Sequence, residues 1–343
     1  MPDSNSVVIS SRVRLARNVA GLPFPHKLRR ERGAMIAKQV YDALAPNGSY
    51  NLYRVSASNQ LDLDVLKEKH LISEDLLRAD NGAAIINDAE TVSIMINEED
   101  HIREQCILRG FKLDEAYAEI NKADDIIGEK VKFAFDARLG YLTCCPSNIG
   151  TGMRASVMMF LPALSLTNGI ESCINAVSRL NMTVRGVYGE GSKADGFIYQ
   201  VSNCKTLGVG EEDIVSSVGN CINSLVESEL AARDRLFHND GAAIRDRVWR
   251  AWGLLTNAYS LSTDEFMSLM AYVKLGAYDG YGLIKISDYD RLEKLVTEAQ
   301  PANIVNISGK ALDGDARGIP PARRDIMRAA YVAKVLKSIG SRA

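Results

Sequence analysis

The segment that most constrains this chain spans residues 140–158 and reads GYLTCCPSNIGTGMRASVM. Its apolar start predicts a short strand over residues 141–143, Pro146 ends that strand, and two glycines lead into a helix that we expect to begin near Thr151. Cys145 would then lie beside a helix N-terminus, where free N–H groups and the helix dipole favour a thiolate or a bound anion. A buried cysteine at a strand–turn–helix corner is an equally good interpretation.

Arginines occur at positions that suggest anion binding. Arg154 would fall in the first turn of the expected helix, where a cation is unfavourable unless a strong anion such as a phosphate binds there too. In SSRVRLAR, residues 10–17, an extended backbone would place Arg12 and Arg14 on one face as a doubly charged fork. A solvated edge strand explains these alternating arginines equally well.

An acidic segment, NEEDHIR over residues 97–103, follows an apolar run that predicts a strand over residues 92–97. Its three consecutive carboxylates are too dense for a core without partners, so they must face solvent or a charged ligand. A solvated turn and a binding site are equally good interpretations of this segment alone.

Two other features add candidates. His70 ends a predicted helix over residues 61–70 and is either a C-cap or a ring that packs on a base, with the cap favoured. A predicted strand over residues 182–187 leads into RGVYGEGS, where Arg185 and Glu190 flank a glycine-rich loop that could close over a substrate.

The sequence contains no GxxxxGK[ST] loop and no protein-kinase signature, so phosphate binding would depend on arginine side chains. Several arginine side chains together can neutralise a triphosphate and hold it by bidentate hydrogen bonds. The acids Glu99 and Glu190 would lie beside it. The candidates are Arg12, Arg14, Arg103, Arg154 and Arg185.

Composition excludes several classes of protein. A net charge of -2 argues against a general nucleic-acid or membrane surface, and the longest apolar run, residues 157–166, is too short to span a bilayer. The N-terminus shows no secretion signal, and the six cysteines lack regular spacing, which is typical of reduced thiols in the cytoplasm. Without CxxC or HExxH, we expect no metal held by protein side chains, no membrane contact and no direct nucleic-acid partner.

Four motifs in chain order, SSRVRLAR, NEEDHIR, CPSNIGTG and RGVYGE, resemble those of the ATP:guanido phosphotransferases. The closest resemblance is to the bacterial protein-arginine kinases of the McsB type, over residues 7 to 335. The first arginine motif begins at Ser10, which leaves no room for the separate N-terminal domain of small-guanidine kinases. Ser147 stands where threonine is usual in CPTN and keeps the hydroxyl, and only nine residues precede Ser10.

This resemblance implies an α/β (α+β) fold in which an antiparallel sheet is flanked by helices, with a smaller C-terminal helical domain. Residues 1–240 would form the catalytic domain, and residues 241–343 would mediate dimerisation and bind phosphoarginine. The chain would transfer the γ-phosphate of ATP to arginine side chains of proteins. By the same resemblance, Mg²⁺ would bridge the phosphates and be held mainly by them and by water.

The resemblance also assigns the site. Glu99 would be the base, Glu190 would clamp the other side of the acceptor, and the Cys145 thiolate would complete a negative pocket. His70 would contact the adenine. The implied ATP-binding residues are Ser10, Ser11, Arg12, Val13, Arg14, His70, Arg103, Arg154, Ala155, Ser156, Val157, Met158, Arg185, Gly186, Val187, Tyr188, Gly189 and Glu190.

Near the C-terminus, RDIMRA resembles the phosphoarginine-binding motif of the protein-arginine kinases. A solvated helix with an Asp–Arg pair is the alternative for this segment. The implied binding residues are Arg324, Asp325, Ile326, Met327, Arg328 and Ala329.

By resemblance alone we expect a cytoplasmic homodimer whose partners are protein substrates with exposed arginines, an activator protein, a stress-response repressor and a Clp unfoldase or protease. Phosphorylation would then mark proteins for degradation and regulate stress repressors. Two alternatives remain open: a kinase for free arginine or another small guanidine, and a non-catalytic reader of phosphoarginine.

Overall fold

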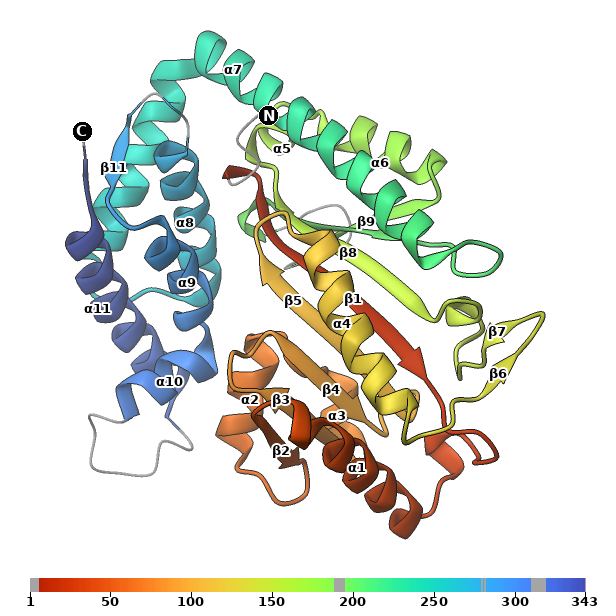
Figure 1. Cartoon of the computed structure of the whole chain (residues 1–343). Helices are drawn as coiled ribbons and strands as arrows, with labels where there is room; N and C mark the ends of the chain where they lie inside the picture. The colour runs from red at the N-terminus through yellow and green to blue at the C-terminus, as the bar shows by residue number, and fades with distance from the viewer. Residues whose placement is uncertain (1–5, 188–194, 279, 281, 310–318, 343) are drawn as a thin grey trace.

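The computed structural model describes residues 6–187, 195–278, 280, 282–309 and 319–342. A central sheet of eight antiparallel strands crosses the N-terminal two thirds of the molecule (Figure 1). In spatial order its strands are β2 (Tyr50–Arg54), β3 (Ala83–Asn87), β4 (Val92–Ile96), β5 (Ile102–Arg109), β1 (Val8–Arg17), β8 (Met153–Phe160), β10 (Ile198–Asn203) and β9 (Met182–Gly186).

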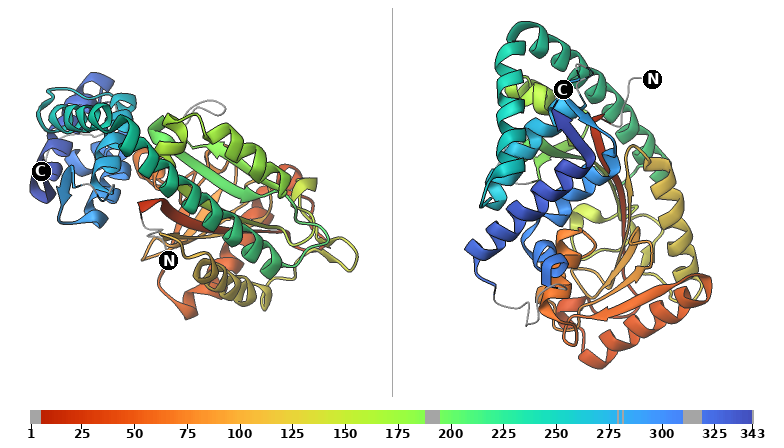
Figure 2. Two further views of the ribbon diagram at one scale, coloured as in Figure 1. Left: turned by 90° about the horizontal axis from the view of Figure 1, so that it is seen from above. Right: turned by 90° about the vertical axis from the view of Figure 1, so that its left-hand side faces the viewer.

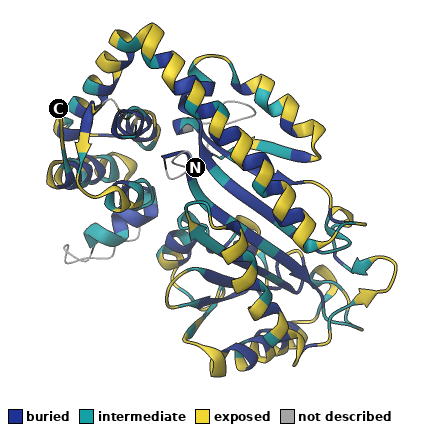
Figure 3. Cartoon of the chain, turned by 45° about the horizontal axis from the view of Figure 1, so that its top comes forward, coloured by how far each residue is buried: buried dark blue, intermediate teal, exposed yellow. Residues whose placement is uncertain are grey.

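Helices cover one face of this sheet. α1 (Arg30–Leu44), α4 (Leu113–Gly128) and the first part of α7 (Glu211–Asn257) lie across it, and alternate residues of β1 such as Val13 and Leu15 are fully buried beneath them. Period-two alternation along each strand sends these apolar side chains to one face. The outer surfaces of the helices are exposed, whereas the central strands are mostly buried (Figure 3).

The opposite face has a second apolar cluster over β3 and β4. It is formed by α2 (Gln60–Glu68) and α3 (Glu74–Arg78), whose Leu66 and Leu76 pack with Ile86 and Met95. The remaining elements of this part are α5 (Pro162–Leu166), α6 (Ile170–Arg179), the small β6–β7 pair (Phe135–Asp136 and Gly140–Tyr141) and 3₁₀ turns at Pro25–Lys27, Ala45–Asn47, Pro146–Asn148 and Asp195–Phe197.

The C-terminal helices form a separate lobe beside the sheet (Figure 2). The long helix α7 connects the two parts, and its one residue with non-helical backbone angles is Asp240. The lobe contains the second part of α7 with α8 (Thr263–Ala277), β11 (Ile284–Ile286), α9 (Tyr289–Glu298), α10 (Pro301–Gly309), α11 (Pro321–Ile339) and β12 (Gly340–Arg342). The architecture confirms the expected fold class.

One sequence prediction of local structure is wrong. Residues 153–160 form strand β8 rather than a helix from Thr151, because this segment pairs along its length with β1 and β10. Tertiary pairing overrides the turn signals of Pro146 and the two glycines, which suit either outcome. Just before the loop that contains Pro146, Phe133 makes an isolated bridge with Val19, and Phe135 begins the two-residue β6.

The loop that carries Cys145 is fixed at Gly150. Gly150 has φ +116°, and its carbonyl accepts a hydrogen bond from the Tyr141 N–H at 2.8 Å. A Cβ at this position would lie 2.1 Å from the Thr206 carbonyl oxygen, so glycine alone fits there. This close crossing determines where residues 142–149 lie.

We predict that Gly150→Ala lowers the free energy of unfolding by about 3 kcal/mol, because both the backbone angle and the contact with Thr206 are violated. Gly208→Ala is the matched control. Its φ is also positive, at +71°, but no atom lies within 4 Å, so the cost there is about 1 kcal/mol. Urea denaturation of both variants measures the difference, and equal losses would show that the crossing at Gly150 is not constrained.

Candidate functional site

The five arginines singled out in the sequence lie on one face of the sheet. Arg14 of β1 is directly opposite Arg154 of β8 on one side and Gln105 of β5 on the other. Residues paired across strands share a face, and Arg103 lies two residues before Gln105, so it shares that face too. Arg12 is two residues before Arg14.

Arg185 joins this group through β10. It is opposite Gln200, which is opposite Met158, and Met158 shares the face of Arg154 because the two are four residues apart on β8. We call the surface formed by Arg12, Arg14, Arg103, Arg154 and Arg185 the arginine face.

The arginine face is electrostatically strained. Burial, and then repulsion by Arg103 and Arg154, lowers the pKa of Arg12 to about 10. The pKa of Arg14 falls well below its usual value for the same reasons, burial first, and burial followed by Arg185 lowers that of Arg154. The buried Nε atoms of Arg14 and Arg154 have no hydrogen-bond partner among the described residues. Such a surface favours a polyanion, which would supply acceptors and remove the repulsion.

Arg103 is held by a carboxylate of the acidic segment. Its Nη1 lies 2.5 Å from Oε2 of Glu98, whose side chain is fully buried and also accepts a hydrogen bond from the Ser73 hydroxyl. Glu98 is therefore committed to orienting an arginine.

The acidic residues lie in a tight turn, residues 97–100, which we call the acid turn. Asn97 begins it with φ 58°, and its N–H donates to the carbonyl of His101 at 2.9 Å. Asp100 is buried and accepts hydrogen bonds from Asn18 and from the backbone N–H of Cys144, both at 2.6 Å. His101 bonds through both ring nitrogens, to Val19 and Pro23.

Glu99 is left available by this arrangement. Its side chain is exposed and makes no hydrogen bond or ion pair with any described residue. Partial burial, and then the neighbouring Asp100, raise its pKa above the ordinary carboxyl value. A carboxylate with a raised pKa and free lone pairs is suited to accept a proton from a substrate.

Cys145 lies beside the acid turn, but not at an α-helix N-terminus as the sequence suggested. It precedes the single 3₁₀ turn Pro146–Asn148, and its Sγ lies 3.0 Å from the Ser147 hydroxyl oxygen. The bond from the Cys144 N–H to Asp100 ties this loop to the acid turn. The helix dipole that we expected to act on Cys145 is therefore replaced by a local hydroxyl contact.

His70 is both a helix cap and a neighbour of the arginine face. It follows α2 with φ 61°, the left-handed conformation that ends a helix, which confirms the cap prediction. Burial, and then Arg12, lower the pKa of its imidazole to about 4, so the ring is neutral at neutral pH. Its carbonyl accepts a hydrogen bond from Gln105 at 2.9 Å.

The other predicted ATP-binding residues divide by strand alternation. Ser10, Ser156 and Met158 share the arginine face, whereas the buried side chains of Ser11, Val13, Ala155 and Val157 face the helices. Gly186 and Val187 continue from Arg185. Tyr188, Gly189 and Glu190 lie outside the described residues.

The two arginines of the RDIMRA segment lie in different environments. Arg328 is 1% exposed and donates to the carbonyls of Ala299 and Leu261 and to Asp325, at 2.7, 2.7 and 2.6 Å. Its guanidinium therefore points into the lobe. Arg324 is half-buried and lines a cavity of about 520 Å³ between α2 and the helices α10 and α11. Ile326 is exposed, Met327 half-buried and Ala329 buried.

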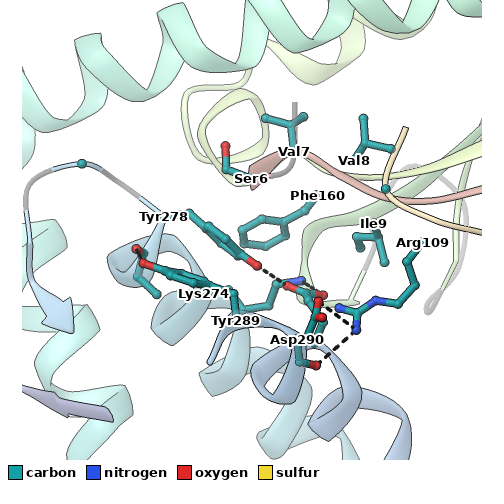
Figure 4. A pocket seen from close by; sticks show the side chains of 14 residues that line it. Ser6, Val7, Val8, Ile9, Arg109, Phe160, Lys274, Tyr278, Tyr289 and Asp290 are labelled. Atoms are coloured by element: carbon teal, nitrogen blue, oxygen red, sulfur yellow. Dashed lines mark hydrogen bonds and ion pairs between the residues drawn. The ribbon is translucent and has the colours of Figure 1, made fainter. Parts of the chain in front are cut away.

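Two cavities are relevant, one beside Glu99 and one at the junction of the catalytic part and the C-terminal lobe. Glu98 and Glu99 line one of about 600 Å³, together with the acids Asp75 and Asp80, and we call it the Glu99 cavity. Another of about 630 Å³ lies at the junction of the two parts (Figure 4), where Lys274 and the Tyr278 hydroxyl both bond to Glu293. In the wall of the Glu99 cavity Asp75 and Asp80 lie 4.0 Å from Arg78 and Arg30. Glu99 is the carboxylate there without a partner among the described residues, which makes it a better group for a cationic acceptor than the paired Glu293.

Two functional contacts were not anticipated from the sequence: the hydrogen bond from Gln105 to His70 and the link between Asp100 and the Cys144 N–H. The spacing of Arg103 and Gln105 on a strand could have revealed the first. The described residues include no group of three or more His, Cys, Asp and Glu side chains suited to bind a metal ion. Every helix among them is too short or too polar to cross a membrane.

Two solved kinases have a fold similar to that of this chain. The duplicated taurocyamine kinase from Schistosoma mansoni is 29% identical with a TM-score of 0.59, over 65% of this chain and 33% of that one. This chain therefore spans about a third of the length of that duplicated enzyme. Lombricine kinase is 28% identical with a TM-score of 0.60, over 66% of this chain and 67% of its own.

Comparison with families and curated relatives gives a more specific result. The family described as ATP:guanido phosphotransferase, C-terminal catalytic domain, matches residues 34–232, and the protein-arginine kinase McsB C-terminal domain matches residues 241–343. The protein-arginine kinase of Caldanaerobacter subterraneus subsp. tengcongensis is 44% identical over 96% of this chain and 97% of its own, and that of Bacillus subtilis is 41% identical over 96% and 90%. The chain belongs to the protein-arginine kinases, within the ATP:guanido phosphotransferase family.

Proposed function

We propose that this protein transfers the γ-phosphate of ATP to arginine side chains of other proteins. The observation that carries the proposal is the arginine face, with the unpaired Glu99 on the acid turn that also holds Arg103. The triphosphate would lie on the arginine face, and the adenine would lie against His70, whose neutral imidazole suits stacking on a base. Mg²⁺ would be held by the phosphates and water, which fits a site where the described residues form no cluster of protein ligands.

The acceptor needs help because a guanidinium has a pKa above about 12 and no free lone pair. Glu99 would orient one nitrogen towards the γ-phosphorus and take its proton as the N–P bond forms and the bond from the γ-phosphorus to the bridging oxygen of ADP breaks. The acceptor would enter the Glu99 cavity, where four carboxylates, among them Asp75 and Asp80, outnumber the guanidinium groups of Arg30 and Arg78. Cys145 and Glu190 would complete it.

A protein acceptor is favoured over a small guanidine by the curated relatives named protein-arginine kinase, which match nearly the whole chain. The solved taurocyamine and lombricine kinases keep the small-guanidine alternative as the second candidate. We further propose a catalytic unit of residues 1–240 and a C-terminal unit of residues 241–343 that dimerises and binds phosphoarginine. A cytoplasmic location, an activator, a stress repressor and Clp-type degradation rest on family resemblance alone.

Incubation with ATP and a basic unfolded protein should give phosphate bound to arginine, stable in alkali and lost in acid, and free arginine should be a poor acceptor.

Glu99→Gln should lower turnover about a hundredfold or more, because the base is lost, with little change in ATP affinity. Turnover of the wild type should fall on acidification, since protonation through the raised pKa of Glu99 removes the base.

Asp42→Asn is the control for that experiment, since Asp42 pairs with Lys38 on the exposed side of α1. Normal turnover in Glu99→Gln would remove Glu99 from the mechanism. Rapid phosphorylation of free arginine, with none on protein, would favour the small-guanidine alternative.

Replacing Arg14 should separate stability from binding. Arg14→Met removes a buried, repelled cation and should raise the free energy of unfolding of the ligand-free protein by about 1–4 kcal/mol, while ATP affinity is lost. Arg17→Met is the matched control. Arg17, on the other face of the same strand, is 1% exposed and bonded to Asp124 at 2.8 Å, so its loss should destabilise by about 3–5 kcal/mol. A destabilised Arg14→Met would show that the arginine face is not strained.

Phosphoarginine binding to the C-terminal unit should depend on Arg324. In the presence of a saturating ATP analogue, which occupies the arginine face, Arg324→Gln should weaken phosphoarginine binding about tenfold by calorimetry, because one charge-assisted phosphate contact is lost. Arg323→Gln, its exposed neighbour, is the control. Asp325→Ala should also weaken binding, but it leaves the buried Arg328 without its carboxylate and so lowers stability too. Unchanged affinity in Arg324→Gln would contradict the proposed site.

A further inference from the structure

The catalytic part and the C-terminal lobe meet at a carboxylate. Glu68, the last residue of α2, accepts hydrogen bonds from the backbone N–H groups of Ala302 and Asn303 at 2.7 and 2.8 Å, and from the Asn303 side-chain amide at 2.8 Å. Ala302 and Asn303 lie in the first turn of α10, whose N–H groups have no partners within the helix. Glu68 therefore caps a helix of the other lobe, and the helix dipole strengthens the contact.

The same residue lies at the start of the turn that positions His70. After α2 ends, the N–H of His70 bonds to the carbonyl of Lys67 and that of Leu71 to the carbonyl of Leu66, so the left-handed His70 is fixed by the end of the helix. Gln105, which shares the sheet face of the five arginines, donates to the carbonyls of His70 and Leu71 at 2.9 Å. One short segment thus contacts α10 at one end and the arginine face at the other.

The contacts at the junction cavity lie away from the nucleotide position. At the junction cavity Arg109 bonds to Asp290, and Lys274 lies 4.7 Å from the centre of the Phe160 ring (Figure 4). Arg109 and Phe160 are the last residues of β5 and β8, whereas Arg103 and Arg154 are the second residues of these two strands. Glu68 is two residues from His70, so its contact with α10 gives a short connection between the lobe and the proposed adenine position.

We propose that Glu68 is a positioning residue that couples the docking of α10 to the binding of ATP beside His70. When Glu68 caps α10, the end of α2 is fixed and His70 is already in place to receive the base, so ATP binding costs less conformational entropy. The coupling is reciprocal, since a ligand that fixes His70 must also stabilise the cap. The cavity that holds Arg324 is also lined by Glu68, so a ligand bound there would act on the same contact.

This inference rests on the proposed position of the adenine, and the experiment tests the two separately in the full-length protein. Binding of an ATP analogue is measured by calorimetry, and the exchange of the Ala302 and Asn303 amide hydrogens by mass spectrometry or NMR. Glu68→Gln should raise the dissociation constant about fivefold or more and speed exchange at both amides, while kcat at saturating ATP changes less than about twofold. Glu74→Gln is the control, because Glu74 pairs with Lys67 and Arg78 on the exposed surface.

In the wild type, the analogue should slow exchange at Ala302 and Asn303. Asn303→Ala, which alters the contact from the other side, should weaken ATP binding as well, and combining it with Glu68→Gln should add little. Unchanged ATP affinity in Glu68→Gln, despite faster exchange in α10, would overturn the coupling and leave Glu68 a structural cap. Unchanged affinity in His70→Ala would instead overturn the proposed adenine position, and the inference with it.

Discussion

Repulsion among buried guanidinium groups is the interaction on which the rest of this structure depends. Burial, and then repulsion by neighbouring guanidinium groups of the arginine face, lowers the pKa of Arg12, Arg14 and Arg154. The Nε groups of Arg14 and Arg154 lack partners among the described residues. The paired strands resist this repulsion because their hydrogen bonds fix every register. We propose that this cost in stability maintains a surface arranged for a polyphosphate, so that little reorganisation would be needed when a nucleotide binds.

Strand alternation separates functional from structural charge. Arg17, on the same strand as Arg14 but on its other face, is paired with Asp124 and lies 3.5 Å from the centre of the Tyr141 ring. Glu104, next to Arg103, is also on the helix side, where complete burial followed by Asp124 raises its pKa well above the ordinary value. These charges beneath the helices are thus paired or neutralised, whereas on the arginine face Arg103 is paired with Glu98 and we propose that a ligand neutralises the others.

Much of the site could be predicted from the sequence, because the relevant rules are local. Alternation on one strand placed Arg12 and Arg14 together, and the density of acids after an apolar strand identified the acid turn. Long-range contacts could not be predicted from such local rules. Residues 153–160 pair with β1, and Arg328 is surrounded by carbonyls, in both cases because of partners distant in sequence. Glu98 holds Arg103 rather than an acceptor because the fold sets the direction of its side chain.

The central claim is that the arginine face is the triphosphate site. A crystal structure with a non-hydrolysable ATP analogue and Mg²⁺ tests it most directly. The account predicts phosphate oxygens within hydrogen-bond distance of Arg12, Arg14, Arg103, Arg154 and Arg185, with the base against His70 and Glu99 facing the terminal phosphate. An analogue bound in the junction cavity beside Lys274 and Tyr278, with the arginine face vacant, would contradict it.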